Sequence, residues 1–383
     1  MFNNYLLSKN KFFIYTNYSL AFAGSLLFLI YAKEIGLSNL KQYILVISLS
    51  SIFVSIIYST SIKSKFQNGL ISIGISNKTI IIILLLSIIA SFYLATKSFY
   101  LFIFFYLNIL YEIGLNLILI YFIKREKTLH HSLLQLFNIL IKVFLLFILS
   151  KFLNNLLIIT AIYYIFFLLV FLFFFKRLQI IFNSHERSFK IIDFFFVLTG
   201  SLIFQIDKIL GEKFLSVDQY FLYFIIFKIS SIFQIGGSIL LQPARNALLA
   251  KEKITTSINK ELIYFIKLLL LALLFINFCI YFLIYLPINY DIQDLLLTKN
   301  ILIYNFFCIA FILHSYNGFY IDALFINDFS KNLFILNSFM LILQIIIMFY
   351  SKSLLLWSFS IMITQIILSI YPVYKYKKCL KIL

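Results

Sequence analysis

Ionisable and amide side chains lie inside long apolar stretches of this sequence, and their chemistry needs an explanation. Asn108, Glu112 and Asn116 recur every four residues and therefore share one face of a helix. Asn138 and Lys142 share a face of the next apolar stretch. Glu112 and Lys142 lie at matching depths of about 16 and 15 Å, at 1.5 Å per residue. This spacing predicts an ion pair at mid-membrane, with two interpretations: a structural pair that keeps two helices in register, or a site of substrate or ion coupling.

A second group of polar residues is expected in the C-terminal half. Lys228 lies about 13 Å from the outer end of its stretch, too far from either end to extend its ammonium to water. We therefore expect Lys228 to enter a cavity, with Gln234 following on the same helix. Asp207 and His314 are candidates for ion coupling, since His titrates near neutrality. For His314, a hydrogen-bonded interfacial side chain is the alternative.

The interior is thus rich in amides and lysines and poor in carboxylates. Lysine supplies positive charge for phosphate, and Asn and Gln supply donors and acceptors for sugar hydroxyl groups. This favours a substrate that is anionic and rich in hydroxyl groups. Hydrogen bonds between helices use the same residue types and are the structural alternative.

The elements that hold these residues are predicted to be membrane-spanning helices. Of the 383 residues, 63% are apolar and 12% are charged, against about 45–50% and about a quarter in soluble domains. A helix needs about 20 apolar residues to cross the bilayer. Twelve runs meet this requirement: 12–32, 42–61, 79–95, 99–123, 132–150, 155–175, 189–209, 219–242, 262–287, 301–322, 333–350 and 353–373.

The distribution of charge predicts the orientation of these helices. Alternate loops on one side hold 21 of the 32 Lys and Arg residues, and those on the other side hold 8. Both termini are therefore expected in the cytoplasm. The net charge of +18 is assigned to lysines beside the membrane, not to nucleic-acid binding. The three Cys and four His residues lack ligand spacing, so neither a metal site nor a cofactor is expected.

The helices are expected to form two lobes of six. Gln42-Tyr43 and Gln219-Tyr220 open corresponding spans, and a Ser-Ser-Ile-Phe block follows each pair. An internal repeat of this kind is common in transporters. The predicted lobes are residues 1–180 and 186–383. All three prolines fall at span ends, so no helix broken at mid-membrane is expected.

Residues 204–250 resemble the polysaccharide (O-antigen, Wzx-like) flippases of the multidrug/oligosaccharidyl-lipid/polysaccharide (MOP) exporter superfamily. The similarity lies in Asp207-Lys208, Tyr220, Lys228 and Pro243, and the segment AKEIGLSNLKQY is similar to the family's opening loop. The resemblance implies two six-helix lobes around a central cavity whose cations correspond to Lys228 and Lys142. The short length of the chain and the absence of Arg from its spans depart from the family pattern.

The activity that this resemblance implies is transport, not catalysis. An isoprenoid (undecaprenyl) pyrophosphate-linked oligosaccharide would cross the bacterial cytoplasmic (inner) membrane for O-antigen, capsule or related glycan assembly. Expected partners are this lipid-linked substrate, membrane lipids, H⁺ or Na⁺, and polysaccharide polymerases and glycosyltransferases.

Two other functions remain alternatives. A cation-coupled multidrug antiporter of the same superfamily would share the fold, but should hold more cavity carboxylates than lysines. A membrane glycan polymerase or glycosyltransferase would need a sizeable outer loop with catalytic groups. No predicted loop is long enough for one.

Overall fold

The computed structural model describes residues 9–68, 77–124, 128–178, 190–234, 237, 256–284, 298–326, 329–351 and 353–380. The regular structure within these residues is α-helical, and each of the twelve predicted spans overlaps one helix. The all-α fold class is therefore confirmed. The helices are α2 (Lys9–Ile35), α3 (Leu37–Asn68), α4 (Asn77–Lys97), α5 (Phe99–Lys124), α6 (Thr128–Leu149), α7 (Leu156–Leu178), α8 (Ile191–Phe214), α9 (Val217–Ser230), α11 (Thr256–Ile284), α13 (Thr298–Ile326), α14 (Ser330–Ser351) and α15 (Leu354–Leu380).

Most of these helices are long and apolar enough to cross a membrane. Among the described residues, eight helices meet this condition: α2, α3, α5, α6, α8, α13, α14 and α15. Three further helices contain shorter apolar segments, at Ile81–Lys97, Leu156–Leu172 and Ile266–Phe278. Helices suit this environment because each satisfies its own backbone hydrogen bonds where no water is available. The cytoplasmic placement of the termini stays a prediction.

Helix α14 shows how the sequence divides into lipid-facing and interior sides. Ile335, Phe339 and Ile342 are exposed on the protein surface, whereas Asn337 and Gln344 are buried. Exposed apolar side chains are expected where lipid covers the protein. The polar residues of this helix therefore point inward, away from the surface that lipid would cover.

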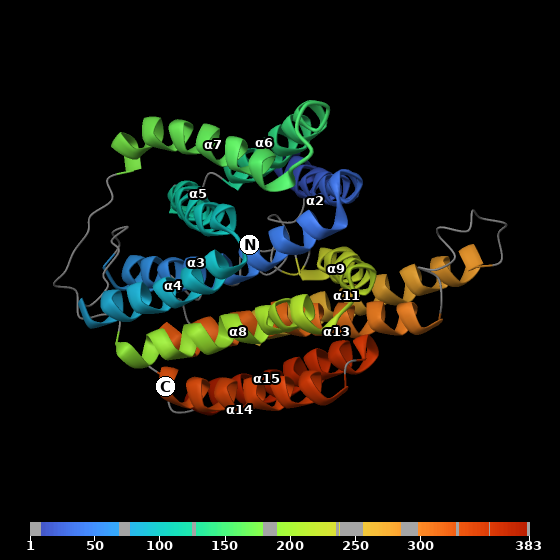
Figure 1. Ribbon diagram of the computed structural model, residues 1–383. Coiled ribbons are helices and arrows are strands. Elements are labelled where there is room, and N and C mark those ends of the chain that lie inside the picture. Colours follow the sequence, from blue (N-terminus) through green and yellow to red (C-terminus); the bar gives the residue numbers. More distant parts are fainter. Residues whose placement is uncertain are drawn as a thin grey trace. The chain divides into compact units, whose positions relative to one another are not determined.

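The chain divides into two compact units. Unit 1 comprises residues 1–201 and 211–221, and unit 2 comprises residues 202–210 and 222–383. In unit 1, α2 packs along α6, and α5 packs against α3, α4 and α7. In unit 2, α15 packs along α13 and α14, and Figure 1 shows α14 and α15 side by side. The lobe boundaries at residues 180 and 186 stay a prediction.

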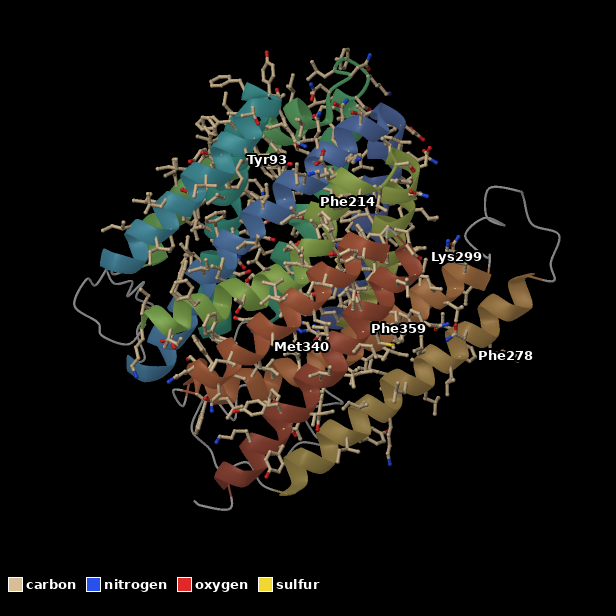
Figure 2. All side chains as sticks on the ribbon, turned by 60° about the horizontal axis from the view of Figure 1, so that its bottom comes forward. Tyr93, Phe214, Phe278, Lys299, Met340 and Phe359 are labelled. Carbon is tan, nitrogen blue, oxygen red and sulfur yellow. The ribbon has the colours of Figure 1, made fainter. Side chains whose placement is uncertain are left out.

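The core of unit 2 combines apolar packing with one buried indole. A buried apolar cluster is formed by Ile203, Met340 and Leu368. Figure 2 labels Met340. Trp357 is fully buried, and its Nε1 donates a hydrogen bond to the Met348 carbonyl oxygen over 3.0 Å. Its ring meets that of Tyr223 edge-on at 6.3 Å between centroids. The buried indole N–H therefore has the hydrogen-bond partner that its burial requires.

Helix α9 is shorter than the sequence predicts. The run 219–242 suggests one continuous span, but α9 ends at Ser230, and a turn at Ser231 precedes helical residues 232–234. Ser231 Oγ donates a hydrogen bond to the Lys228 carbonyl oxygen over 2.6 Å. Serine side chains compete with backbone bonds in this way and bend helices. The expectation that no span is interrupted is therefore wrong at Ser231, where no proline is present.

Helix α8 ends later than the sequence indicates, and Gly237 contacts α13. Helix α8 continues to Phe214, past the predicted span end at 209, so Asp207 and Lys208 lie inside the helix. Gly237, beyond the turn, lies against Ser315 of α13: a Cβ atom at Gly237 would be 2.5 Å from the Ser315 Cβ. Only glycine permits this close approach.

Candidate functional site

A pocket of about 210 Å³ lies within unit 1, between α3 and α5. The three polar residues that the sequence places on one face of α5 all line it, and they meet two serines and two apolar residues of α3. The lining residues are Ile47, Ser51, Val54, Ser55, Asn108, Glu112 and Asn116. The spacing of four residues therefore has the predicted consequence: these side chains open onto one space.

Asn108 is the most deeply buried polar residue of this pocket, with 1% of its surface exposed. Its Nδ2 donates a hydrogen bond to Ser50 Oγ. Its Oδ1 has no hydrogen-bond partner among the described residues. Because an unsatisfied buried acceptor is unfavourable, this oxygen is suited to accept a hydrogen bond from water or a bound ligand.

The other polar groups of the pocket also offer oxygen acceptors. Asn116 Nδ2 donates to the Glu112 carbonyl oxygen over 2.8 Å, so its donor is used within the helix. Ser51 and Ser55 use their hydroxyl hydrogens in the same way, on carbonyl oxygens of their own helix at 2.9 and 2.7 Å. The lone pairs of these hydroxyl groups and the Glu112 carboxylate remain to face the pocket.

Lys142 lies close to this site but is surrounded by aromatic rings. Its Nζ donates a hydrogen bond to Tyr43 Oη over 2.5 Å. The same ammonium lies 4.5 Å from the ring centroid of Phe28, 5.2 Å from that of Tyr43 and 5.6 Å from that of Tyr164. Three helices, α2, α3 and α7, thus supply π faces to a lysine on α6, an arrangement that stabilises a cation away from water. We refer to these three rings as the aromatic cage.

The predicted partnership of Glu112 and Lys142 has an electrostatic counterpart in the structure. The two groups interact electrostatically, while the hydrogen bond of the ammonium goes to Tyr43. A direct ion pair between them stays a prediction. No local pattern in the sequence indicates the aromatic cage, because its rings come from three separate helices.

Asn138 belongs to a tyrosine network and does not line the pocket. Its Nδ2 donates to Tyr111 Oη over 2.7 Å, and Tyr163 Oη donates to the Asn138 carbonyl oxygen over 3.1 Å. The rings of Tyr111 and Tyr163 meet at 5.5 Å between centroids. This network ties α6 to α5 and α7, as expected for the structural alternative to sugar binding.

In unit 2, the Asp207 carboxylate is engaged by its neighbours. Lys208 Nζ lies 3.1 Å from Asp207 Oδ1, and Tyr223 Oη donates to Asp207 Oδ2 over 2.8 Å. The Lys208 ammonium also lies 3.8 Å from the ring centroid of Phe227. Both charged residues are buried, so this is a desolvated pair with additional hydrogen bonds.

The remaining predicted site residues are also in unit 2. His314 packs against the ring of Phe204 at 4.2 Å between centroids. The Gln234 carbonyl oxygen accepts a hydrogen bond from Ser315 Oγ over 3.2 Å. Lys228 lies one turn before the interruption of α9, and its ammonium makes no hydrogen bond or ion pair with a residue that the structure describes.

The structure thus divides the predicted site residues into two sets. Asn108, Glu112, Asn116, Asn138 and Lys142 fall in unit 1, and the first three share the pocket. Asp207, Lys228, Gln234 and His314 fall in unit 2.

The turn between α8 and α9 makes contacts that no local pattern in the sequence predicts. Lys97 Nζ at the end of α4 lies 2.6 Å from Glu212 Oε1 near the end of α8. Lys41 Nζ at the start of α3 donates to the Leu215 carbonyl oxygen over 3.1 Å. These residues all belong to unit 1. The number of charged residues in each loop cannot predict such pairs, because the partners are over a hundred residues apart in the sequence.

Solved structures identify the fold. No family model and no curated protein matches the sequence. A MATE protein in complex with MaL6 has a TM-score of 0.54 at 12% identity, over 96% of this chain and 94% of that chain. An outward-facing multidrug resistance MATE family transporter of the MOP superfamily has a TM-score of 0.53 at 12% identity, over 98% of this chain and 97% of that chain.

A third structure, a MATE protein in the straight conformation, has a TM-score of 0.53 at 12% identity, over 96% of this chain and 94% of that chain. The chain therefore has the two-lobed, all-helical MATE fold over nearly its whole length. At this level of identity the likeness shows the fold, and membership of the MOP superfamily stays a prediction. The assignment to the polysaccharide flippases stays a prediction.

Proposed function

We propose that this protein is a flippase for an isoprenoid pyrophosphate-linked oligosaccharide. The observation that supports this most is Lys228, a cation within an apolar helix and without a hydrogen bond or ion pair to any described residue. Placing an ionisable residue inside a membrane helix costs free energy, so a functional role is the first interpretation for such a residue. Phosphate is the ligand that an ammonium of this kind binds as a point charge.

Two other lysines of the spans are engaged within the protein, and a third, Lys267, is exposed near the start of its span. Lys208 is paired with Asp207, and Lys142 is held by Tyr43 and the aromatic cage. Lys228 is therefore the cation that we assign to the pyrophosphate. The amides that line the pocket, Asn108 and Asn116, are assigned to the glycan, because amide groups can donate hydrogen bonds to hydroxyl groups and accept them.

In the proposed cycle the two lobes expose the substrate alternately to each side of the membrane. The isoprenoid tail stays in the bilayer while the headgroup crosses. The compartment is the bacterial cytoplasmic membrane, where glycosyltransferases would supply the substrate and a polymerase for O-antigen, capsule or a related polysaccharide would receive it.

Proton or sodium coupling is assigned to Glu112 in preference to Asp207 or His314. Glu112 lines an open pocket, whereas Asp207 is held by Lys208 and Tyr223. His314 packs on Phe204. A carboxylate that a cation can reach is the better coupling group.

The test is flipping of a fluorescent undecaprenyl pyrophosphate-linked oligosaccharide in proteoliposomes, with the exposed headgroup quenched from outside. Loss of a charged hydrogen bond is worth about 1.5–3 kcal/mol, so Lys228→Ala should weaken the apparent affinity about 10- to 100-fold. Lys228→Arg should retain most of it. Lys213→Ala, an exposed lysine of α8, is the control. Equal flipping by Lys228→Ala and the wild type would contradict the role of Lys228.

A cation-coupled multidrug antiporter is the second candidate, because a multidrug resistance transporter shares the fold. The same proteoliposomes, loaded with a cationic dye, separate the two. Dye efflux driven by a proton or sodium gradient, without flipping of the lipid-linked glycan, would establish the antiporter. The solved structures with this fold are transporters, which favours transport over a glycan polymerase or glycosyltransferase. Lengthening of the glycan by the purified protein would contradict this.

A further inference from the structure

The pocket between α3 and α5 has a size and chemistry that define its ligand more closely. We propose that it binds one neutral, hydroxyl-rich sugar ring of the transported glycan, with Asn108 Oδ1 and the Glu112 carboxylate accepting hydrogen bonds from the ring hydroxyl groups. The inference rests on the proposed function and assigns the sugar, as distinct from the pyrophosphate, to a site within unit 1.

The volume of the pocket suits one sugar ring better than a bare ion or a whole drug-sized molecule. Its roughly 210 Å³ corresponds to about seven waters at about 30 Å³ each, far more than a bare ion needs. It is smaller than the roughly 300–1,000 Å³ of pockets that enclose drug-sized molecules. A single six-membered ring with its substituents lies between these limits.

The polar lining matches the donors that a sugar presents. Asn108 Oδ1 is buried without a partner among the described residues, and a ligand hydroxyl group would supply the missing hydrogen bond. Ser51 and Ser55 direct their own hydrogens to carbonyl oxygens of α3. These hydroxyl groups are therefore acceptors toward the pocket, as the Glu112 carboxylate is, and a sugar ring carries several donors.

The apolar lining completes the match. Ile47 and Val54 line the same pocket as the serines and amides. A pyranose ring has C–H groups on its faces and hydroxyl groups at its rim, so it needs a few directed polar partners among apolar contacts. Binding sites for small molecules combine these two features.

The charges around the pocket favour a neutral ligand. The described lining includes no lysine or arginine, so a phosphate would meet the Glu112 carboxylate without a balancing cation. The Glu112 carboxylate interacts electrostatically with Lys142, which is outside the lining, so the protein itself supplies a counter-charge. A bulky organic cation would have to compete with Lys142 for this carboxylate, whereas a neutral sugar ring leaves that interaction in place.

The test is binding of free monosaccharides to the purified full-length protein in nanodiscs, by saturation-transfer NMR and calorimetry. The probes are methyl α-D-glucopyranoside and N-acetyl-D-glucosamine, with tetramethylammonium chloride and inorganic phosphate as competing probes. We expect a sugar to bind the wild-type protein, and Ser55→Leu, which fills the pocket, to weaken binding at least about tenfold. Glu112→Gln and Asn108→Leu should weaken it as well.

Ser369→Leu is the matched control. Ser369 is also half-buried in a helix and also donates to the carbonyl oxygen four residues earlier, but it lies in unit 2. It should bind sugar like the wild type, and circular dichroism should show every variant folded.

The possible outcomes separate this inference from the proposed function. Flipping of the lipid-linked glycan without monosaccharide binding, or equal binding by Ser55→Leu and the wild type, would overturn the inference and leave the function standing. Binding of tetramethylammonium or phosphate in place of sugar would also overturn it. Sugar binding lost in Ser55→Leu, in a protein that does not flip the glycan, would support the pocket and reject the flippase.

Discussion

Lys97 and Glu212 form an ion pair, with 2.6 Å between Nζ and Oε1, that joins the end of α4 to the end of α8. Close by in the chain, Tyr220 packs onto Gly211, where a Cβ atom would be 2.8 Å from the Tyr220 ring. Residues 211–221 belong to unit 1, whereas the adjoining parts of α8 and α9, residues 202–210 and 222–230, belong to unit 2. The turn is therefore anchored on α3 and α4 by polar contacts, and Tyr220 packs within the turn itself.

This ion pair should make the stability of the protein depend on pH in the alkaline range. Partial burial by itself would lower the pKa of Lys97, but the hydrogen bond and charge of Glu212 outweigh it and raise the pKa above its ordinary value. The stabilisation is therefore present at neutral pH and is lost as the pH rises through the raised pKa. Lys97→Met should cost about 0.2–1 kcal/mol at pH 7 and nothing once the pH exceeds that pKa.

The measurement is the thermal unfolding midpoint of the wild type and Lys97→Met between pH 7 and 12. Lys213→Met changes an exposed lysine of the same turn region and serves as the control. A difference between wild type and Lys97→Met that stays constant across this range would contradict the assignment of the stabilisation to the ion pair.

Removal of one member of the buried pair in unit 2 should be more harmful than removal of both. Asp207→Asn leaves the Lys208 ammonium buried without its carboxylate. This should lower the free energy of unfolding by about 3–5 kcal/mol. In the double variant Asp207→Asn/Lys208→Met no charge is left, and most of that loss should be recovered. Asp218→Asn, at an exposed position of α9, is the control.

Chemical unfolding of these variants in detergent gives the comparison. If the double variant is less stable than Asp207→Asn, the unpaired ammonium is not the source of the penalty, and the contacts of Lys208 with the Phe204 carbonyl oxygen and the Phe227 ring carry the stability instead.

The aromatic cage predicts graded effects at Tyr43. Tyr43→Phe removes the hydrogen bond to the Lys142 ammonium but keeps the ring, and should cost about 1.5–3 kcal/mol. Tyr43→Leu also removes a π face, and should cost about 0.5–2 kcal/mol more. In a Lys142→Met background, both costs should shrink, as a double-mutant cycle would reveal. Equal costs with and without the lysine would contradict the cage.

Gly237 should tolerate no side chain unless space is made opposite it. In Gly237→Ala the new Cβ would be 2.5 Å from the Ser315 Cβ, an overpacking that typically costs about 1–3 kcal/mol. Adding Ser315→Gly removes the obstructing atoms and should restore most of the stability. Gly318→Ala is the matched control, since a Cβ there meets nothing within 4 Å, and it should gain about 0.5–1 kcal/mol from helix propensity. Failure of Ser315→Gly to rescue would show that another contact requires the glycine.

Hydropathy predicts the fold well because each helix must satisfy its own backbone in lipid. All twelve apolar runs contain a helix, and the four-residue spacing of Asn108, Glu112 and Asn116 correctly predicts a shared face. Local signals fail where the determinant is a contact from elsewhere in the chain. The Lys142 cage is such a case, because it gathers rings from three helices. Hydropathy misses the interruption of α9 at Ser231 for a different reason, since it does not register a serine hydroxyl group that bonds to the backbone.

In the candidate site, too, local sequence predicts what lies on one helix but not which other helix packs against it. Sequence spacing identifies which side chains of α5 face the pocket, because they lie on one helix. It does not identify Ser51 and Ser55 as their counterparts, because the pairing of α3 with α5 depends on tertiary packing. For Asp207, the sequence shows the adjacent Lys208, but the hydrogen bond from Tyr223 comes from the following helix.

The buried position of Trp357 makes the protein its own spectroscopic reporter. The chain has a single tryptophan, and it lies wholly within unit 2, bonded to Met348 and packed against Tyr223. Excitation at wavelengths that tyrosine does not absorb should therefore yield emission from the C-terminal lobe alone. A substrate or gradient that rearranges α9 would change that emission without any attached label.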